Sequence, residues 1–247
     1  MSADELTPTP PDLDRAGMLE VLRDGESEVL GRMPWISNAT LLVEVTHSRG
    51  CMRAVYKPRR GERPLWDFPA GLDRREVAAY ELSRWLGWDL VPETVLRSDD
   101  VPFGPGSLQR FVPFDPEQHY FTLLEDRERH AALRTICCFD VLANSADRKG
   151  GHCLAGDDGR IWAVDNGLTF HDEPKLRTVI WDFATEAVPD DLLAGAARLV
   201  DEGDPPALGE LIDPAERAAL VRRAEELLAD GTFPVDLSGR CYPWPLV

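Results

Sequence analysis

The chain has 247 residues, of which 43% are hydrophobic and 29% charged, the composition of a folded globular protein and not of a disordered or fibrous one. That length can bury a core and allows one or two domains. The 27 Lys and Arg residues against 44 Asp and Glu residues give a formal net charge of −17, which repels nucleic-acid phosphates and anionic lipid head groups at long range. Nucleic acid is therefore not an expected partner. Peripheral lipid contact is disfavoured unless the local basic cluster KPRRGER, residues 57–63, overrides the mean charge.

The cysteines and the N-terminus indicate a cytoplasmic protein. The odd number of cysteines and the lack of any zinc-type spacing favour free thiols in a reducing compartment; they are Cys51, Cys137, Cys138, Cys153 and Cys241. The first residues, MSADELTPTPPDLDR, are acidic and proline-rich where a signal peptide is basic and then apolar. No run approaches the ~20 apolar residues of a membrane span, so no integral membrane association is expected.

In chain order, residues 1–30 predict a leader followed by a short helix, DLDRAGMLEVLRDG, that ends at Gly25. The β-branched and apolar segment ATLLVEVTHSRGCMRAVYKP predicts two strands joined at HSRG. A proline-broken loop, ERPLWDFPAGL, precedes the predicted helix DRREVAAYELSRWLGW, which stops at Gly87. The segments LVPETVLRS and SLQRFVP predict two further strands. Residues 31–113 therefore predict a small antiparallel sheet that carries one helix.

Residues 114–247 predict a larger, mostly helical half. The segment LLEDRERHAALRTICCFDVLANSA has early acids and a long apolar face, which predicts one helix. Two short strands, HCLAG and RIWAVDNG, follow around the turn DDGR. The segments PDDLLAGAARLVDEG and DPAERAALVRRAEELLADG predict two helices with acids at the start and glycine at the end. The fold class expected from the whole pattern is α+β.

Four residues occur in the order that phosphoryl transfer needs, namely a lysine for the phosphates, an acid to fix it, an acid at the attacking hydroxyl and an acid for a metal. Lys57 ends the second predicted strand, and Glu76 lies in the first turns of the next helix. Asp147 and Asp165 flank the two short strands of the large half, so a hairpin can return the second acid beside the first. Both acids could then serve one site that holds a metal and a phosphate.

Five segments make the chain resemble the phosphatidylinositol 3- and 4-kinase superfamily, most of all the type II phosphatidylinositol 4-kinases and their bacterial, mostly actinobacterial, relatives. They are AVYKP, REVAAYELSRWLG, LQRFVP, NSADRKGGHCL and WAVDNGLTF. The resemblance covers about residues 36–183, and its most specific part is the pair DR and DNG. It implies a protein-kinase-like bilobal fold with an N-lobe over residues 31–113, a C-lobe over residues 114–247, and ATP-dependent phosphoryl transfer with Mg²⁺ or Mn²⁺.

The resemblance also implies roles for single residues. Lys57 matches the lysine that contacts the ATP phosphates and Glu76 its helix partner, while Asp147 matches the catalytic aspartate and Asp165 the metal-binding aspartate. The remaining nucleotide contacts fall on the phosphate-covering loop and on the hinge at adenine, which correspond to Ser37, Asn38 and Thr40 and to Gln109, Phe111 and Val112.

Two departures from the family pattern stand out. His152 occupies the place of a metal-binding asparagine, and because histidine prefers softer metals than magnesium, it predicts manganese preference, a one-metal mechanism or lost activity. The loop ISNATLL contains no glycine, so main-chain amides and the hydroxyls of Ser37 and Thr40 would have to hold the phosphates.

Simpler interpretations stay open for each residue. Lys57 could be a solvated strand end, Glu76 a helix N-terminal acid and Asp165 part of a plain turn. Arg148 and Lys149, next to Asp147, could neutralise charge on the transferred phosphoryl group or be solvated.

Two aromatic residues and a histidine have alternatives as well. Trp181 and Phe183 could recognise substrate or pack in the core. His152 could be a structural histidine, and Asn144 could cap the preceding helix.

The resulting prediction is a kinase that transfers the γ-phosphate of ATP to a hydroxyl-bearing substrate, which could be a phosphoinositide, an inositol-like small molecule or a protein. One alternative is a nucleotide-binding pseudokinase with a regulatory role, favoured by His152 and the glycine-free loop. Another is a protein nucleotidyltransferase, which attaches AMP instead of phosphate.

Overall fold

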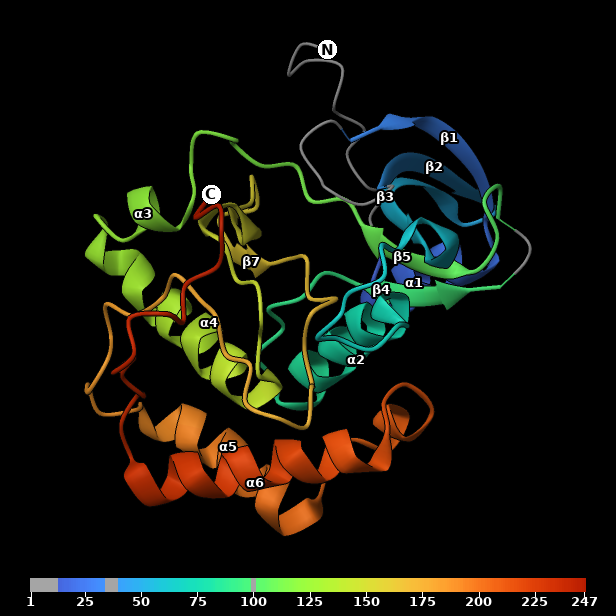
Figure 1. Cartoon of the computed structure of the whole chain (residues 1–247). Coiled ribbons are helices and arrows are strands. Elements are labelled where there is room, and N and C mark those ends of the chain that lie inside the picture. The colour runs from blue at the N-terminus through green and yellow to red at the C-terminus, as the bar shows by residue number, and fades with distance from the viewer. Residues whose placement is uncertain (1–12, 34–39, 99–100) are drawn as a thin grey trace. The chain divides into compact units, whose positions relative to one another are not determined.

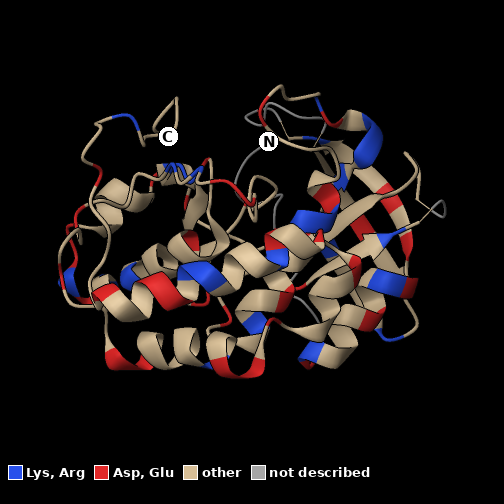
Figure 2. Ribbon diagram, turned by 60° about the horizontal axis from the view of Figure 1, so that its bottom comes forward, with Lys and Arg blue, Asp and Glu red and all other residues tan. Residues whose placement is uncertain are grey.

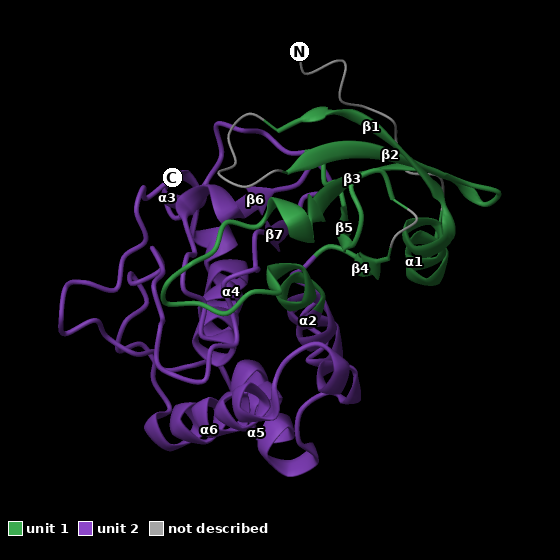
Figure 3. Ribbon diagram, turned by 45° about the vertical axis from the view of Figure 1, so that its right-hand side comes forward, with its two compact units in different colours: residues 1–77, 92–113 green, residues 78–91, 114–247 purple. Residues whose placement is uncertain are grey.

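The computed structural model describes residues 13–33, 40–98 and 101–247. The chain divides into two compact units, Met1–Val77 with Pro92–Pro113 and Ala78–Val91 with Phe114–Val247 (Figure 3). Residues 78–91 group with the second unit, so the units differ from the predicted lobes, whose boundaries stay predictions. An antiparallel sheet in the first unit and mainly helices in the second confirm the predicted α+β class.

The first unit is built on a five-stranded antiparallel sheet in the order β1-β2-β3-β5-β4 (Figure 1). Its elements are α1 (Arg15–Asp24), β1 (Glu26–Arg32), β2 (Leu41–His47), β3 (Gly50–Pro58), β4 (Thr94–Arg97), β5 (Gly106–Arg110) and the first turns of α2 (Leu72–Trp85). The predicted hairpin at HSRG is confirmed, with His47 paired to Gly50. Helix α1 ends at Gly25 as predicted.

Strand β1 was not predicted. Residues 1–30 were interpreted as a leader and a short helix, and this interpretation did not include the strand that begins at Glu26. Its sequence, ESEVLGR, has two large apolar residues, and none of its residues is buried. It pairs with β2 along one edge, with an irregularity between Val29 and Gly31. A polar, irregular edge strand gives no alternating pattern, because one row of its side chains faces water and its pairing comes from the main chain.

Helix α1 covers one face of this sheet. Val21 and Leu22 of the helix join the core side chains of β2, β3 and β5, among them Ala54 and Tyr56. The buried guanidinium of Arg97 donates to the Leu22 and Gly25 carbonyls at 2.9 Å each, which satisfies main-chain acceptors at the C-terminal end of α1. The helix is therefore held to the sheet by apolar packing and by one buried cation.

The second unit is mainly helical. Its elements are the rest of α2, then α3 (Tyr120–Leu123), α4 (His130–Ala143), β6 (Cys153–Ala155), β7 (Ile161–Ala163), α5 (Asp190–Glu202) and α6 (Pro214–Asp230). Strands β6 and β7 form the predicted hairpin. Helices α5 and α6 lie side by side (Figure 1). Each has the predicted acids in its first turn and ends at a glycine with positive φ, Gly203 or Gly231.

The predicted helix over residues 123–146 is shorter in the structure. Helix α3 ends at Leu123, and α4 starts at His130 after a single turn of 3₁₀ helix. The Asp126 carboxylate accepts from the Glu128 amide at 3.0 Å and so begins a new turn where the pattern predicted continuation. The apolar face of α4 is buried as expected, including Leu133, Phe139 and Leu142.

Two broader expectations can be compared with the structure. All five cysteines are free thiols, as predicted. Acidic and basic residues occur on helices and strands alike (Figure 2). Within the described ranges, no helix is both long enough and apolar enough to cross a bilayer.

Gly106 allows the close approach of β5 to the end of β3 and so supports Lys57. A Cβ there would contact the Lys57 carbonyl oxygen and would lie 2.8 Å from Pro58 Cα, both main-chain atoms that cannot rotate away. Gly106→Ala should therefore lower the free energy of unfolding by about 1–3 kcal/mol. Urea denaturation measures this, with Gly31→Ala in β1 as control, where a Cβ meets nothing within 4 Å. Equal stability of the two variants would contradict the prediction.

Candidate functional site

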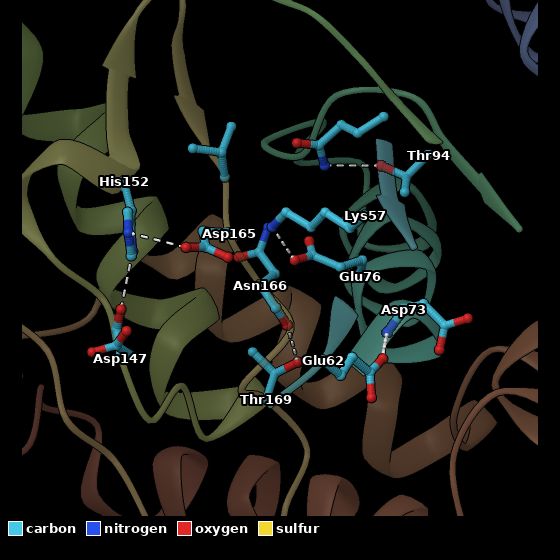
Figure 4. Close-up of polar contacts among 12 residues, drawn as sticks. Lys57, Glu62, Asp73, Glu76, Thr94, Asp147, His152, Asp165, Asn166 and Thr169 are labelled. Carbon is cyan, nitrogen blue, oxygen red and sulfur yellow. Dashed lines mark hydrogen bonds and ion pairs between the residues drawn. The ribbon is translucent and has the colours of Figure 1, made fainter. Parts of the chain in front are cut away.

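The first unit holds Lys57 and Glu76. Residues of β3 alternate between the two faces, so Lys57 lies on the face opposite to the core residue Tyr56. The Lys57 ammonium pairs with Glu76 Oε1 from α2, as Figure 4 shows. The Glu76 side chain is 4% exposed and that of Lys57 20%. A solvated strand end would not carry a buried acid, so this geometry favours the predicted pairing over the simpler interpretation.

The register of the sheet places Gln109 on the same face as Lys57. Lys57 faces Ser107 and Val55 faces Gln109 across β3 and β5. The Gln109 side-chain amide donates to the Thr94 hydroxyl at 2.9 Å, and that hydroxyl donates to the Pro92 main-chain carbonyl at 2.7 Å. Gln109 is therefore engaged inside the sheet, and its predicted ligand contact stays a prediction.

The other predicted nucleotide residues differ in what the structure says of them. Ser37 and Asn38 lie outside the described residues. Thr40 is 1% exposed, and its hydroxyl has no hydrogen-bond partner among the described residues. The Phe111 amide donates to the Arg53 carbonyl at 3.0 Å, and Val112 is buried. A buried hydroxyl without a partner is costly, so Thr40 marks a place where a ligand oxygen could be bound.

In the second unit, Asp147 and Asp165 both lie against His152 (Figure 4). Asp147 follows α4 and Asp165 follows β7, so the β6–β7 hairpin returns the second acid to the first, as its spacing predicts. The His152 Nε2 atom lies 3.3 Å from Asp165 Oδ2, and Lys149 Nζ lies 3.1 Å from Asp147 Oδ2. Four of the five site residues predicted in this unit thus form one cluster, namely Asp147, Lys149, His152 and Asp165.

Both ring nitrogens of His152 have polar neighbours. Its Nδ1 lies 3.0 Å from the Asp147 carbonyl oxygen, to which a protonated Nδ1 would donate. The Lys149 amide donates to the same nitrogen at 3.3 Å, a longer contact that needs an unprotonated Nδ1. In the neutral tautomer with the proton on Nδ1, which the shorter contact favours, Nε2 carries a lone pair directed at the Asp165 carboxylate. Two acceptors this close favour a proton or a cation between them, which is the usual state of a metal-binding histidine.

Burial raises the pKa of Asp147 above its ordinary value, and the Asp165 carboxylate adds to the increase. The Lys149 ammonium and the guanidinium of Arg177 oppose it. Asp147 is therefore a stronger base than a surface aspartate, while the Lys149 ammonium limits the rise of its pKa. Lys149 thus has a role beyond that of a solvated charge.

The turn after β7 differs in detail from the prediction. Asp165 itself has the left-handed φ of +57°, whereas the rigid NG turn was expected after it. Asn166 is fully buried, donates to the Ala163 carbonyl at 3.1 Å, and its own carbonyl accepts from the Thr169 hydroxyl at 2.7 Å. These contacts fix the backbone that carries the Asp165 carboxylate.

The position of Arg148 differs from the prediction that this residue neutralises charge on a transferred phosphoryl group. Its side chain is 0% exposed and pairs with Asp140 of α4, which is also 0% exposed, at 2.9 Å. Its remaining donors reach the Val164 carbonyl at 2.7 Å and the Asn166 side-chain oxygen at 2.6 Å. A guanidinium with these partners cannot reach a substrate. It joins α4, the loop that carries Asp147 and the turn that carries Asp165.

Sequence reasoning missed Asp140 and Asn166, although one signal was present. Asp140 is a charged residue in the apolar face ICCFDVL, and a buried acid requires a buried partner.

Asn144 caps α4 in the left-handed conformation, which confirms the capping interpretation. Phe183 is buried against Phe233 and His130, which supports core packing. The Trp181 indole donates to the Cys241 carbonyl at 3.2 Å.

The donor set fits a cation that phosphates help to hold. The described residues contain no group of three or more His, Cys, Asp or Glu side chains that could hold a metal by themselves. Mg²⁺ in phosphotransferases is commonly bound by one or two carboxylates with the substrate phosphates and water completing the shell. Asp165 with His152 supplies that smaller set.

The fold is protein-kinase-like. It superimposes on hydra Fam20, solved with sugar, with a TM-score of 0.50 and 14% identity, covering 89% of each chain. It superimposes on the Golgi casein kinase with the same score and identity, covering 89% of this chain and 74% of the other. These similarities confirm the predicted kinase-like fold, while membership of the phosphatidylinositol kinases stays a prediction.

No family model matches the chain. It is 42% identical over 261 residues to Protein Rv2133c of Mycobacterium tuberculosis, which covers 91% of this chain and 94% of that protein. The chain therefore belongs to the family of that mycobacterial protein.

The buried Arg148–Asp140 pair predicts a large loss of stability. Arg148→Met leaves the Asp140 carboxylate buried without its cation, so the free energy of unfolding should fall by about 3–5 kcal/mol. Urea denaturation measures the loss. Arg240→Met, at an exposed position, is the control and should change stability little. A loss below about 1 kcal/mol for Arg148→Met would contradict the buried pair.

Lys149→Met should raise the pKa of Asp147 further, because the ammonium 3.1 Å from Oδ2 stabilises the ionised carboxylate. The variant should therefore take up its proton at a higher pH than the wild type. The ¹³C chemical shift of the carboxylate, assigned with Asp147→Asn, measures this without any need for activity. Lys175→Met, whose ammonium pairs with Glu173, is the control. An unchanged or lower pKa in Lys149→Met would show that the prediction is wrong.

Proposed function

We propose that this protein is an ATP- and divalent-cation-dependent phosphotransferase that moves the γ-phosphate of ATP to a hydroxyl group. The observation that carries the proposal is the cluster in which Asp147 and Asp165 both lie against His152, with Lys149 beside the first acid. The kinase-like fold supports it. The Lys57–Glu76 pair adds the phosphate-binding group expected of such an enzyme.

Each residue has a proposed role. Asp147 orients the acceptor hydroxyl and takes its proton, for which its raised pKa is suited. Lys57, held by Glu76, binds the nucleotide phosphates, and Thr40 offers its buried hydroxyl to a phosphate oxygen. Arg148 is a positioning residue that fixes the backbone of both acids. Catalysis then consists mainly of positioning and charge stabilisation.

Asp165 and His152 are the proposed metal ligands. A divalent cation bound there would neutralise charge on the transferred phosphoryl group. Imidazole suits Mn²⁺ better than Mg²⁺, so the histidine in place of asparagine favours manganese. In the tautomer with the proton on Nδ1, which can donate to the Asp147 carbonyl oxygen, Nε2 is available to the cation.

The acceptor is proposed by class alone. The resemblance to phosphatidylinositol kinases suggests a phosphoinositide or an inositol-like molecule. The names of the structural neighbours add a sugar, present in the Fam20 structure, and casein, from the Golgi casein kinase. All four present a hydroxyl to a base, which is the chemistry that Asp147 supplies.

Transfer of label from ATP tests the proposed function. With Mn²⁺ and, separately, Mg²⁺, label from γ-³²P-ATP should pass to water or to an acceptor from these four classes. Asp147→Asn should lower turnover at least about 100-fold by removing the base, and Asp165→Ala should abolish metal-dependent turnover. Asp157→Asn, an exposed aspartate in the same hairpin, is the control and should keep full activity. His152→Asn should shift the preference from Mn²⁺ toward Mg²⁺.

The other outcomes separate the alternatives. Transfer of label from α-³²P-ATP to an acceptor would identify a nucleotidyltransferase. ATP binding that persists in Asp147→Asn, with no turnover in either form, would identify a pseudokinase. A chain that does not bind ATP with either metal would overturn the proposal.

A further inference from the structure

A closed loop, defined here as residues 62–71, connects the strand of Lys57 to the helix of Glu76. One carboxylate closes it, because one oxygen of Glu62 accepts from the Gly71 amide at 3.0 Å. The other oxygen accepts from the Asp73 amide at 3.1 Å (Figure 4). The second contact also holds the start of α2. The two ends of the closed loop are therefore held together by Glu62, and the residues between them form its tip.

Two further contacts anchor the loop from within. Phe68 is 7% exposed and lies under the Arg75 guanidinium, 5.0 Å from it. Beside the loop, Arg59 donates to both oxygens of the buried Asp73 carboxylate, the shortest distance being 2.8 Å. The loop thus has one buried anchor and a rigid base.

The tip of the closed loop carries apolar side chains into water. Residues 63–66, with sequence RPLW, are all exposed, and the Trp66 side chain is 97% exposed and Leu65 40%. Leaving a tryptophan outside while a phenylalanine two positions on is buried costs hydrophobic free energy, unless something else covers the tryptophan. A Trp–Leu pair at a projecting tip is typical of insertion at a membrane interface.

The cations around the tip are unneutralised. Arg60, Arg63 and Arg74 are exposed and make no ion pair with any residue that the structure describes. Two of the three acids nearby are used elsewhere, since Glu62 closes the loop and Asp73 pairs with Arg59. Residues 57–75 contain six basic and three acidic residues in a chain of net charge −17, so this segment is an exception to the mean.

We propose that the closed loop docks on an anionic lipid bilayer, with Trp66 and Leu65 entering the head-group region and the three arginines on lipid phosphates. At physiological salt the Debye length is about 8 Å, so distant acids are screened and the local charge decides the attraction. A stable protein partner needs a surface of about 800 Å² on each side, much more than a tip of four residues. Insertion into a bilayer requires only a small exposed tip. The bilayer also offers Leu65 an apolar environment, which nucleic acid does not.

Co-sedimentation of the full chain with vesicles tests the proposal without any need for catalysis. The wild type should bind vesicles of phosphatidylcholine with phosphatidylserine at physiological salt and should not bind phosphatidylcholine alone. Trp66→Ala should weaken binding at least about 10-fold. Trp244→Ala is the matched control, since this tryptophan is 86% exposed in the second unit, and it should bind as the wild type does. A blue shift of tryptophan fluorescence on binding should be lost in Trp66→Ala alone.

The charge is tested with two triple variants of equal net charge. Arg60→Gln with Arg63→Gln and Arg74→Gln should abolish binding to the anionic vesicles. The control carries glutamine at the exposed Arg127, Arg222 and Arg240 and should keep binding. Failure of the wild type to bind anionic vesicles would overturn the proposal. Equal binding by Trp66→Ala and the wild type would overturn it as well, and so would an equal loss of binding in the two triple variants. Either result would mean that the protein adsorbs to the vesicles without using the closed loop.

Discussion

The buried ion pair between Arg148 and Asp140 is the interaction on which the acidic site depends. A guanidinium taken out of water must have all its donors satisfied, and the partners of this one come from three segments, namely α4, the end of β7 and the following turn. Asp147 precedes Arg148 and Asp165 precedes Asn166 in the chain. Each acid is thus the chain neighbour of a buried residue, Arg148 or Asn166. Because the Arg148–Asp140 pair fixes these buried residues, it also fixes the backbone of the two acids.

The backbone around this pair is held in unfavourable conformations. Asn144, Asp165 and Phe170 all have positive φ although none is glycine. Main-chain hydrogen bonds join the two loops that contain them, from the Phe170 amide to the Ala143 carbonyl at 2.6 Å and from the Ala146 amide to the Leu168 carbonyl at 2.8 Å. Strain of this kind persists where surrounding contacts determine the backbone, and it often accompanies functional sites. Here it places the Asp147 main-chain carbonyl and the Asp165 carboxylate against one histidine, His152.

Pattern predicted most of the fold, and its failures have physical reasons. The alternation of apolar and polar residues predicted β2 and β3, and the helical spacing of apolar residues predicted α2, α5 and α6. Both patterns arise because an element that is buried on one face has apolar residues at a regular period. Strand β1 has no such period, since its pairing comes from the main chain at a polar edge. The start of α4 depends on one Asp126 side chain that redirects the backbone, which spacing does not record.

Among the candidate site residues, type and order indicated Lys57, Glu76, Asp147 and Asp165. The structure gives the first two an ion pair in one unit and the other two a shared histidine in the other unit. The direction of each side chain was beyond the sequence. Arg148 and Lys149 are adjacent cations, yet one is buried on Asp140 and the other lies on Asp147. Only the packing of α4 distinguishes them, because it places a carboxylate where the first can reach it.

The distribution of positive charge completes the argument about function. A chain with net charge −17 that is proposed to bind anionic phosphates must concentrate its cations and keep its acids away from them. Residues 57–75 do so twice, first at Lys57, which pairs with the buried Glu76, and then around the closed loop, where Glu62 accepts from main-chain amides and Asp73 pairs with Arg59. One connection between β3 and α2 therefore holds the cations proposed for the nucleotide and those proposed for the lipid surface. The same Glu62 contact that shapes the loop also fixes the start of the helix that presents Glu76 to Lys57.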